Sequence, residues 1–256
     1  MRHEAPSIAG ATYHGLAGKA VIVTGGATGI GADIVRAFDA QGCRVGFVDI
    51  AAEAGAALAA SLRDAHFERG DVTDVTDLQA AIGRLQARIG GTDVLVNNVA
   101  NDDRHDIDTV TPEYFDGRIA VNLRPHFFAT QAVLLAMRAR GGGAIVNIGS
   151  NSWMVKARRL VVYATAKSAM TGFTRTLARE LGADNIRVNC VVPGWVMTER
   201  QTTLWVDAEG EATMDREHCL PGRVFGSDIA QMVLFVAADT ARMITAQVFV
   251  VDAGWS

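Results

Sequence analysis

The chain has 256 residues and a formal net charge of −4, with 49% hydrophobic and 20% charged residues. This composition predicts a folded chain with a sizeable core and argues against wholesale disorder. It gives no strongly basic surface for nucleic acid, and no apolar run reaches the 18 residues that a membrane span needs. The first 17 residues lack the apolar core of a signal peptide. We therefore expect an N-terminal tail (1–17) and a single domain (18–256).

The three cysteines, Cys43, Cys190 and Cys219, are widely spaced and show no pairing pattern. The first two lie in or beside predicted strands, which suits buried thiols in a reducing cytoplasm. The six histidines form no His-x-x-x-His motif, and Cys-x-x-Cys is absent. We therefore expect a cytoplasmic protein without a catalytic metal.

Residues 19–24 predict a short buried strand that runs into a glycine-rich turn and then a helix. Glycines let the backbone approach a pyrophosphate, and the amino end of a helix offers free N–H groups with partial positive charge. The spacing is Gly-x-x-x-Gly-x-Gly, and its place between strand and helix favours dinucleotide binding. The residues of this turn that we expect at the cofactor are Gly25, Ala27, Thr28, Gly29, Ile30 and Gly31.

A second strand is predicted over 44–48, and Asp49 stands at its end, followed by Ile50. A carboxylate here can accept hydrogen bonds from the adenosine ribose, and it would repel a 2′-phosphate. No arginine follows it, so the sequence favours NAD over NADP. The alternative is that Asp49 only caps the next helix.

Strands and helices then alternate, which predicts an α/β fold: a single Rossmann-type, doubly wound parallel sheet with helices on both faces. The further predicted strands are 66–69, 93–96, 144–148, 186–192 and 247–251. The predicted helices after the first are 52–63, 75–89, 113–138, a long one from about 163 to 181, and 228–238. Residues 197–222 show no clean period and predict a substrate lid.

Polar residues follow two of these strands. Asp71, with Val72, can meet the adenine amino group, and Asn98, Val99 and Ala100 lie where the sheet should reverse and the cofactor should bind. The next residues, 101–106, are strongly polar. We expect them to solvate a loop, and a metal site is the alternative.

The strand over 144–148 leads to Ser150, and the following helix carries Tyr163 and Lys167. Residues four apart share one helix face, so an ammonium would lie beside the phenol and lower its pKa from about 10 toward that of a general base. Alternatively, Tyr163 only caps a core helix and Lys167 is a solvated charge. Asn122 precedes Pro125 within the helix 113–138, where it is either a buried relay or a surface amide.

With these motifs the chain resembles the short-chain dehydrogenase/reductase family over residues 16–256. The matching motifs are Thr24–Gly31, Asp71, Asn97–Ala100, Asn122, Ser150, Tyr163-x-x-x-Lys167 and Pro193-Gly194 with Thr198. The family usually has alanine then glycine where this chain has Val99 and Ala100, and the loop stays small and apolar.

The resemblance implies a sheet of about seven strands, a homotetramer built through two long helices, and a catalytic Asn122, Ser150, Tyr163 and Lys167. In that scheme Tyr163 takes the substrate proton, Ser150 orients the same oxygen, and Asn122 anchors a water. Lys167 lowers the tyrosine pKa and holds the nicotinamide ribose, so it and Tyr163 also count as cofactor residues. Further cofactor residues implied by the family pattern are Pro193, Gly194, Val196 and Thr198.

Within the family the chain resembles bacterial aldose 1-dehydrogenases of the D-xylose type, which oxidise the anomeric hydroxyl of a pyranose to a lactone with a nicotinamide cofactor. The residues that carry this are 101–105, 122–124, Ser150-x-Ser152-Trp153, 190–194, Arg200-Gln201 and 252–255. Trp153, Trp195 and Trp205 fall on segments that should border the substrate, and aromatic faces with polar neighbours suit a sugar. Alternatively, these tryptophans pack the lid.

The run Lys156, Arg158 and Arg159 lies between the predicted catalytic serine and tyrosine, so a wall of the substrate pocket would be basic. Guanidinium groups match oxyanions well, which favours an anionic sugar such as sulfoquinovose or a uronate, with Arg200 closing on the same group. A solvated or oligomer-contact run is the alternative. The expected substrate residues are Asn101, Ser150, Ser152, Trp153, Lys156, Arg158, Arg159, Tyr163, Trp195 and Arg200.

Three rival functions stay open at this point. The first is a neutral aldose dehydrogenase acting on xylose, arabinose, fucose or galactose. The second is a dehydrogenase of the same fold that acts on a secondary alcohol or a 3-oxoacyl group. The third is a sensor or scaffold that binds the nucleotide without turnover.

Overall fold

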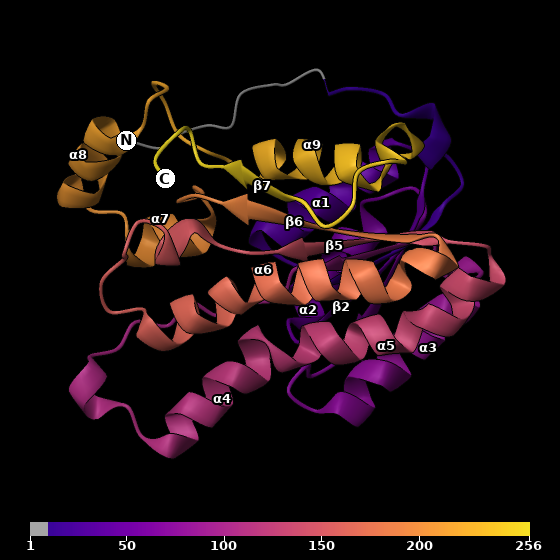
Figure 1. Ribbon diagram of the computed structural model, residues 1–256, viewed down its shortest axis with the longest axis horizontal. Helices are drawn as coiled ribbons and strands as arrows, with labels where there is room; N and C mark the ends of the chain where they lie inside the picture. Colours follow the sequence, from indigo (N-terminus) through magenta and orange to yellow (C-terminus); the bar gives the residue numbers. More distant parts are fainter. Residues whose placement is uncertain (1–9) are drawn as a thin grey trace.

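Short apolar runs rich in valine and isoleucine form a seven-stranded sheet in the computed structural model, which describes residues 10–256 (Figure 1). The strands are β1 (Ala20–Thr24), β2 (Arg44–Asp49), β3 (Ala65–Arg69), β4 (Val94–Asn97), β5 (Gly143–Ile148), β6 (Ile186–Pro193) and β7 (Val248–Val251). All neighbours pair in parallel, in the order β3-β2-β1-β4-β5-β6-β7. The chain thus starts in the middle of the sheet and winds outward in both directions, as the sequence predicted.

Helices cover both faces of the sheet, because a parallel sheet buries both faces. One core joins the strands to α1 (Gly29–Ala40), α2 (Ala52–Ala60) and α9 (Gly226–Ala237). The other joins them to α3 (Val75–Ile89), α5 (Arg124–Ala139) and α6 (Val161–Leu181). Figure 1 shows α1 and α9 above the sheet and α3, α5 and α6 below it.

The sequence predicted one continuous helix over 113–138. This prediction is wrong, because two helices fill the range. α4 (Pro112–Asn122) ends at Leu123, which has φ −132° and ψ −54°, and α5 begins at Arg124. Pro125 lies in the first turn of α5, where its missing N–H costs nothing. The break leaves Asn122 at the end of α4, fully buried.

The predicted tail 1–17 is wrong for its second half, and residues 1–9 lie outside the described residues. Residues His14–Leu16 form a short 3-10 helix, η1, and the Leu16 side chain is fully buried in the core of α1 and α9. The Leu16 carbonyl accepts a hydrogen bond from the Cys43 thiol at 3.1 Å. A single apolar side chain thus fixes the entry to β1.

The predicted lid 197–222 holds two helices, α7 (Glu199–Leu204) and α8 (Ala208–Glu217). Each has a side-chain cap at its start: the Thr198 hydroxyl accepts from Gln201 N at 3.4 Å, and the Asp207 carboxylate accepts from Gly210 N at 2.8 Å. Both helices are short and polar, so they leave no apolar period in the sequence. They lie together at one end of the sheet, beside the carboxyl ends of the strands (Figure 1).

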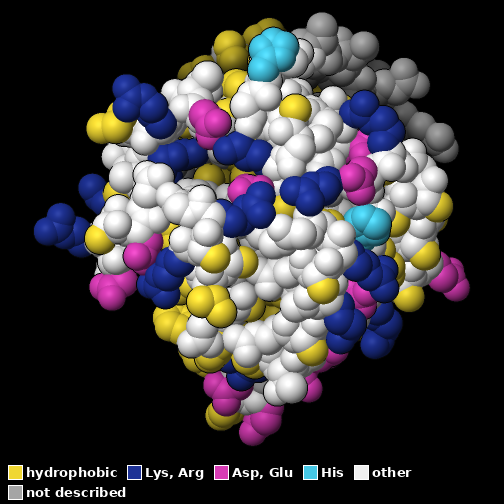
Figure 2. All heavy atoms as spheres, turned by 90° about the vertical axis from the view of Figure 1, so that its right-hand side faces the viewer, with side chains coloured by type: hydrophobic (Ala, Val, Ile, Leu, Met, Phe, Trp, Pro, Cys, Tyr) yellow, Lys and Arg dark blue, Asp and Glu magenta, His cyan; other side chains and the backbone are white. Residues whose placement is uncertain are grey.

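The opposite end of the molecule, at the amino ends of the strands, carries many basic side chains with acidic ones beside them (Figure 2). Ion pairs at this end join Arg140 to Asp93 at 2.6 Å and Arg138 to Asp184 at 2.7 Å. These charges therefore satisfy one another and give no argument for an anion site. Within residues 10–256, no helix has both the length and the apolar run that would span a bilayer.

Candidate active site

A cavity of about 1250 Å³ opens at the carboxyl ends of the strands. Its walls come from the turn after β1, the loops after β2 to β6, and the start of α6 and α7. The strand order reverses here, between β1 and β4, and the two loops diverge to leave a crevice. The cavity is large enough for a dinucleotide and a small substrate together.

The turn between β1 and α1 is shaped for a phosphate. Thr28, the N-cap of α1, makes no side-chain capping bond, so the N–H groups of the first helical turn keep their partial positive charge toward the cavity. A Cβ at Gly31 would overlap the carbonyl oxygen of Gly25, and a Cβ at Gly25 (φ 67°) would lie 2.8 Å from the Val99 Cα. Only glycine fits either position, and the resulting cradle fits a pyrophosphate.

Asp49 lies at the end of β2 on the cavity wall, and its carboxylate accepts from Ala27 N at 2.9 Å and Ala51 N at 3.0 Å. It therefore orders the phosphate turn as well as the start of α2. Asp71 also lines the cavity, and hydrogen bonds from the Thr73 hydroxyl and N–H hold the pKa of Asp71 below its usual value. Both carboxylates are placed to accept hydrogen bonds from a nucleoside.

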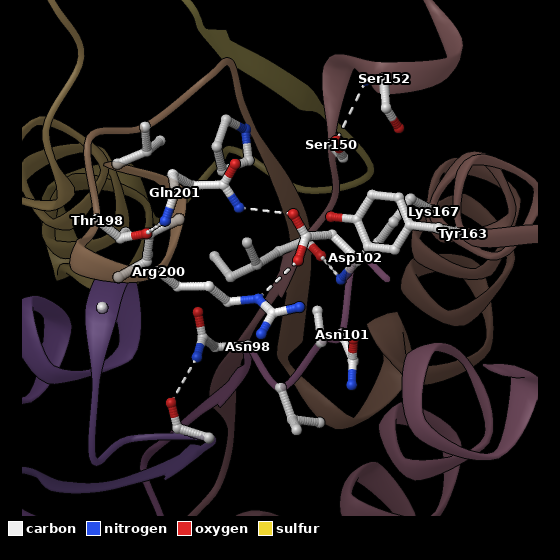
Figure 3. A pocket seen from close by; sticks show the side chains of 18 of the residues that line it. Asn98, Asn101, Asp102, Ser150, Ser152, Tyr163, Lys167, Thr198, Arg200 and Gln201 are labelled. Carbon is white, nitrogen blue, oxygen red and sulfur yellow. Dashed lines mark hydrogen bonds and ion pairs between the residues drawn. The ribbon is translucent and has the colours of Figure 1, made fainter. Parts of the chain in front are cut away.

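The Asn98 side chain mainly links two loops by hydrogen bonds. Its Nδ2 donates to the carbonyl oxygens of Thr24 at 3.1 Å and Gly25 at 2.8 Å (Figure 3). This holds the turn after β1 against the loop after β4. The other predicted cofactor residues line the cavity except Ala27, which contributes its N–H to Asp49.

Ser150, Tyr163 and Lys167 meet in the cavity, and Figure 3 shows them together on one wall. Ser150 lies two residues after the end of β5, and its Oγ accepts from Ser152 N at 3.2 Å. Lys167 is fully buried, and its Nζ donates to the Ile148 carbonyl at 2.8 Å. Asn122 lies behind the cavity wall: its Oδ1 accepts from Asn101 N at 2.8 Å and its Nδ2 donates to Asn101 O at 3.1 Å.

The predicted lowering of the Tyr163 pKa by Lys167 is absent from this structure. Burial of the phenol raises the pKa of Tyr163, and hydrogen bonding with Ser150 only partly opposes it. Burial also lowers the pKa of Lys167 to about 8. Both shifts favour the neutral forms, because an apolar setting penalises any charge. Without bound ligands, Tyr163 is therefore a protonated phenol that can donate or share a hydrogen bond.

The loop 101–106 was expected to be solvated, but its side chains contact three other parts of the molecule. Asp102 accepts from Arg200 Nε at 2.9 Å and from Gln201 Nε2 at 2.6 Å, both on α7. The Arg104 guanidinium lies 4.3 Å from the centroid of the Trp205 ring and 5.8 Å from that of Trp195. These contacts tie the loop to the segment predicted as a lid.

His105 ties the same loop to the catalytic helix. Its Nε2 accepts from Val162 N at 3.3 Å, directly before Tyr163, and its Nδ1 lies 3.1 Å from the Tyr114 hydroxyl on α4. The Nε2 acceptor requires a neutral ring with the proton on Nδ1. Sequence reasoning missed Asp102, Arg104, His105 and Gln201 as site residues, although the six polar residues in a row at 101–106, at the point where the strand order reverses, were a usable signal.

The structure brings eight of the ten expected substrate residues to the cavity. They are Asn101, Ser150, Ser152, Lys156, Arg158, Tyr163, Trp195 and Arg200. Trp153 is absent from the wall and 40% exposed, because successive residues of a 3-10 turn point about 120° apart and Ser152 takes the inward position. Trp205 packs on Arg104 rather than lining the wall.

The basic run splits between the cavity and the surface. The backbone turns sharply at Lys156 (φ 57°) and Arg159 (φ 61°), so the three side chains diverge. Lys156 and Arg158 line the cavity, whereas Arg159 pairs outside it with Asp106 at 3.1 Å. The expectation for Arg159 as a substrate residue is therefore not met. Among residues 10–256, no three His, Cys, Asp or Glu side chains gather as metal ligands would.

Comparisons with known proteins show the family to which the chain belongs. Residues 25–256 match the family model described as enoyl-(acyl carrier protein) reductase. The chain is 47% identical over 249 residues to the D-xylose 1-dehydrogenase of Caulobacter vibrioides, covering 96% of this chain and 98% of that protein. It is 44% identical over 241 residues to a probable galactose dehydrogenase of Rhizobium meliloti, covering 92% and 94%.

Solved structures give the same result. A short-chain dehydrogenase/reductase mutant of Serratia marcescens is 32% identical, with a TM-score of 0.88 over 95% of this chain and 100% of that one. A metagenomic blue fluorescent protein in complex with NADPH is 34% identical (TM-score 0.88; 94% and 99% covered). A 7α-hydroxysteroid dehydrogenase complexed with NADH and 7-oxo glycochenodeoxycholic acid is 29% identical (TM-score 0.90; 94% and 95%). The chain belongs to the short-chain dehydrogenase/reductase family and is an oxidoreductase.

Burial of Lys167 predicts that a side chain proposed for catalysis lowers the stability of the fold. A pKa lowered from 10.5 to about 8 means that the folded state disfavours the ammonium by roughly 3 kcal/mol. This cost is fully present below pH 8 and disappears as pH rises through 10.5, where the unfolded chain also loses its proton. Lys167→Met should therefore raise the free energy of unfolding by about 1–3 kcal/mol at pH 7 and by little at pH 10.5.

Urea unfolding of both proteins at the two pH values measures this difference. Leu181→Met, a change of similar size at the other end of α6, serves as the control and should not show the pH dependence. A Lys167→Met protein that is less stable than the parent at pH 7 would show that the ammonium stabilises the fold.

Proposed function

We propose that this protein is an NAD-dependent sugar 1-dehydrogenase that oxidises the anomeric hydroxyl of an aldopyranose to a lactone. The observation that carries the proposal is the meeting of Ser150, Tyr163 and Lys167 in one cavity with the open amino end of α1. That arrangement puts the tyrosine that we propose as the proton acceptor beside a dinucleotide cradle. The similarity to enzymes named for xylose and galactose supports a sugar as substrate.

The proposed chemistry divides between cofactor and protein. NAD held by the glycine-rich turn at Gly25–Gly31 would supply the acceptor for the hydride at C1 of the sugar. Ser150 donates a hydrogen bond to the oxygen at C1 and Tyr163 takes the proton from it. Lys167, fully buried one turn after Tyr163, favours the phenolate when it is charged. Asn122 holds Asn101 at the cavity wall by two backbone hydrogen bonds, and we keep its water-anchoring role as a prediction.

Removal of one oxygen tests the assignment of the base. Tyr163→Phe should abolish turnover and leave NAD binding intact, because the cradle at Gly25–Gly31 is untouched. Turnover is followed by NADH absorbance, and binding by titration calorimetry with NAD. Activity above about a hundredth of the parent would show that another group takes the proton.

We propose a preference for NAD that rests on Asp49. Its carboxylate lines the cavity, two N–H groups hold it in place, and no cation follows it at Ile50. A 2′-phosphate at this wall would meet a like charge. The relatives of known structure bind NADH in one case and NADPH in another, so a nicotinamide cofactor is supported by both and the choice depends on this wall.

The cofactor ratio measures the role of Asp49. We expect kcat/KM for NAD to exceed that for NADP by at least about tenfold, and Asp49→Ala to narrow the gap because the repulsion is removed. Glu53→Ala, an exposed carboxylate four residues along, is the matched control and should leave the ratio unchanged. Equal use of NAD and NADP by the parent protein contradicts the argument.

We propose further that the substrate carries an anion remote from C1, as sulfoquinovose or a uronate does. Lys156, Arg158 and Arg104 all line the cavity, and burial lowers the pKa of Arg104, as expected for a cation that lacks full solvation. Arg200 is already paired with Asp102, so its predicted closure on the anion has a competitor. The neutral aldoses stay as the alternative.

Adjacent arginines give a matched test of the anion site. Arg158→Ala should lower kcat/KM for glucuronate or sulfoquinovose at least about tenfold, with little change for glucose or xylose. Arg159→Ala removes the same side chain outside the cavity and should leave the ranking intact. If the parent enzyme has a higher kcat/KM for neutral sugars than for anionic ones, and Arg158→Ala leaves that ranking unchanged, the proposed anion site does not exist.

We also propose a homotetramer located in the cytoplasm. α5 carries two exposed apolar side chains, Phe127 (55%) and Leu135 (82%), which suit a helix–helix contact between subunits. The three free cysteines suit a reducing compartment.

A further inference from the structure

Asp102 is a carboxylate that lies between the predicted base and the α7 segment. It follows β4 in the loop 101–106 and lines the cavity, with its side chain 20% exposed. Figure 3 shows its carboxyl group beside the Tyr163 hydroxyl on one side and Arg200 and Gln201 on the other. No motif in the sequence predicted a role for it.

Hydrogen bonds fix the Asp102 carboxylate but occupy only about half of its acceptor positions. One oxygen accepts from Arg200 Nε at 2.9 Å, and the other accepts from Gln201 Nε2 at 2.6 Å. The Gln201 amide is itself fixed, because its Oε1 accepts from Trp195 Nε1 at 2.9 Å. A carboxylate offers about four acceptor positions, so about two stay available on the side of the cavity. Two fixed oxygens of this kind match two neighbouring hydroxyl groups.

If Asp102 only fastened its loop to α7, its ion pair with Arg200 would be explained, but the position of this pair in the cavity would not. Arg159 and Asp106, in the same region, show what a surface pair looks like, with side chains 58% and 66% exposed. Asp102 is instead turned into the cavity, where its oxygens face the place in which the reacting carbon must lie to reach Tyr163. Because both of its partners lie on α7, its orientation depends on the position of that helix.

We propose that Asp102 binds ring hydroxyl groups of the sugar other than the one at C1 and thereby places C1 against Tyr163. The inference rests on the proposed oxidation of a polyhydroxylated substrate. It makes Asp102 a specificity-determining residue, because an alcohol without further hydroxyls leaves the remaining acceptor positions of the carboxylate without a partner in a partly buried site. Its contacts to Arg200 and Gln201 make this binding depend on α7 being in place.

The charge on Asp102 has a second consequence. Its negative field is among the causes that raise the pKa of Tyr163, after burial. The other charged groups near this phenol are Lys167 on α6 and Arg200 on α7, with Arg104 in the same loop. Replacing the carboxylate by a neutral amide should lower the pKa of Tyr163, so the pH profile for oxidation should shift toward acid.

The test is a cycle that combines a protein change with a substrate change. Asp102→Asn keeps the size and one acceptor oxygen and loses the charge. We expect it to lower kcat/KM about 10- to 100-fold on the aldose that the parent enzyme oxidises best. On one of the 2-, 3- or 4-deoxy forms of that sugar the same variant should lose less than about threefold, because the hydroxyl it would bind is gone.

Asp106→Asn is the matched control, since it makes the same change in the same loop at an exposed carboxylate outside the cavity. It should leave both kcat/KM and the pH profile unchanged. An equal loss for Asp102→Asn on the parent sugar and on all three deoxy sugars, or no loss at all, overturns the proposal. So does a pH profile that moves toward base.

Failure of the sugar proposal gives a different pattern. If the parent enzyme oxidises a linear polyol and no aldose, the same cycle is run with that polyol and its deoxy forms. Coupling there supports the role of Asp102 while the sugar assignment falls. If the preferred substrate has a single hydroxyl, both proposals are overturned.

Discussion

The site depends on the loop 101–106, which links the catalytic helix to the segments around it. His105 accepts from the Val162 N–H at the start of α6, so this loop sets the position of the turn that carries Tyr163. Asn101 is clamped by Asn122 at the end of α4, and Asp102 and Arg104 reach the α7 segment. Four residues of this loop thus hold α4, α6 and α7 in register around one cavity. The catalytic groups can keep their geometry only while these contacts persist.

The break between α4 and α5 allows a contact with the same loop. Because α4 ends at Asn122, the buried amide has no helical neighbour after it and can turn both ends toward Asn101. Lys167, on the neighbouring helix α6, lowers the free energy of unfolding, because burial disfavours its charged form. Burial also raises the pKa of Tyr163, so the ionised tyrosine is a state that bound ligands must favour, and the folded chain alone does not supply it.

Local patterns in the sequence were enough to predict the parallel sheet and the glycine-rich turn. Apolar runs such as β1 and β6 form strands wherever they lie, and the turn at Gly25–Gly31 needs only its own strand and helix. The pairing of Asp102 with Arg200 joins residues 98 positions apart, and no local pattern contains it. The raised pKa of Tyr163 depends on burial by many segments, so the spacing to Lys167 misjudged its direction. Leu16 was missed because a single large aliphatic side chain in a stretch rich in glycine and alanine has no period.

The direct measurement of the central claim is turnover of an aldose by the unmodified protein. The purified enzyme is incubated with NAD and each of xylose, glucose, galactose, glucuronate and sulfoquinovose, with NADH followed by absorbance and the product by NMR. The account predicts NADH formation with at least one of these sugars and a lactone as the first product. NAD binding without NADH formation from any sugar, or oxidation at a carbon other than C1, would contradict it.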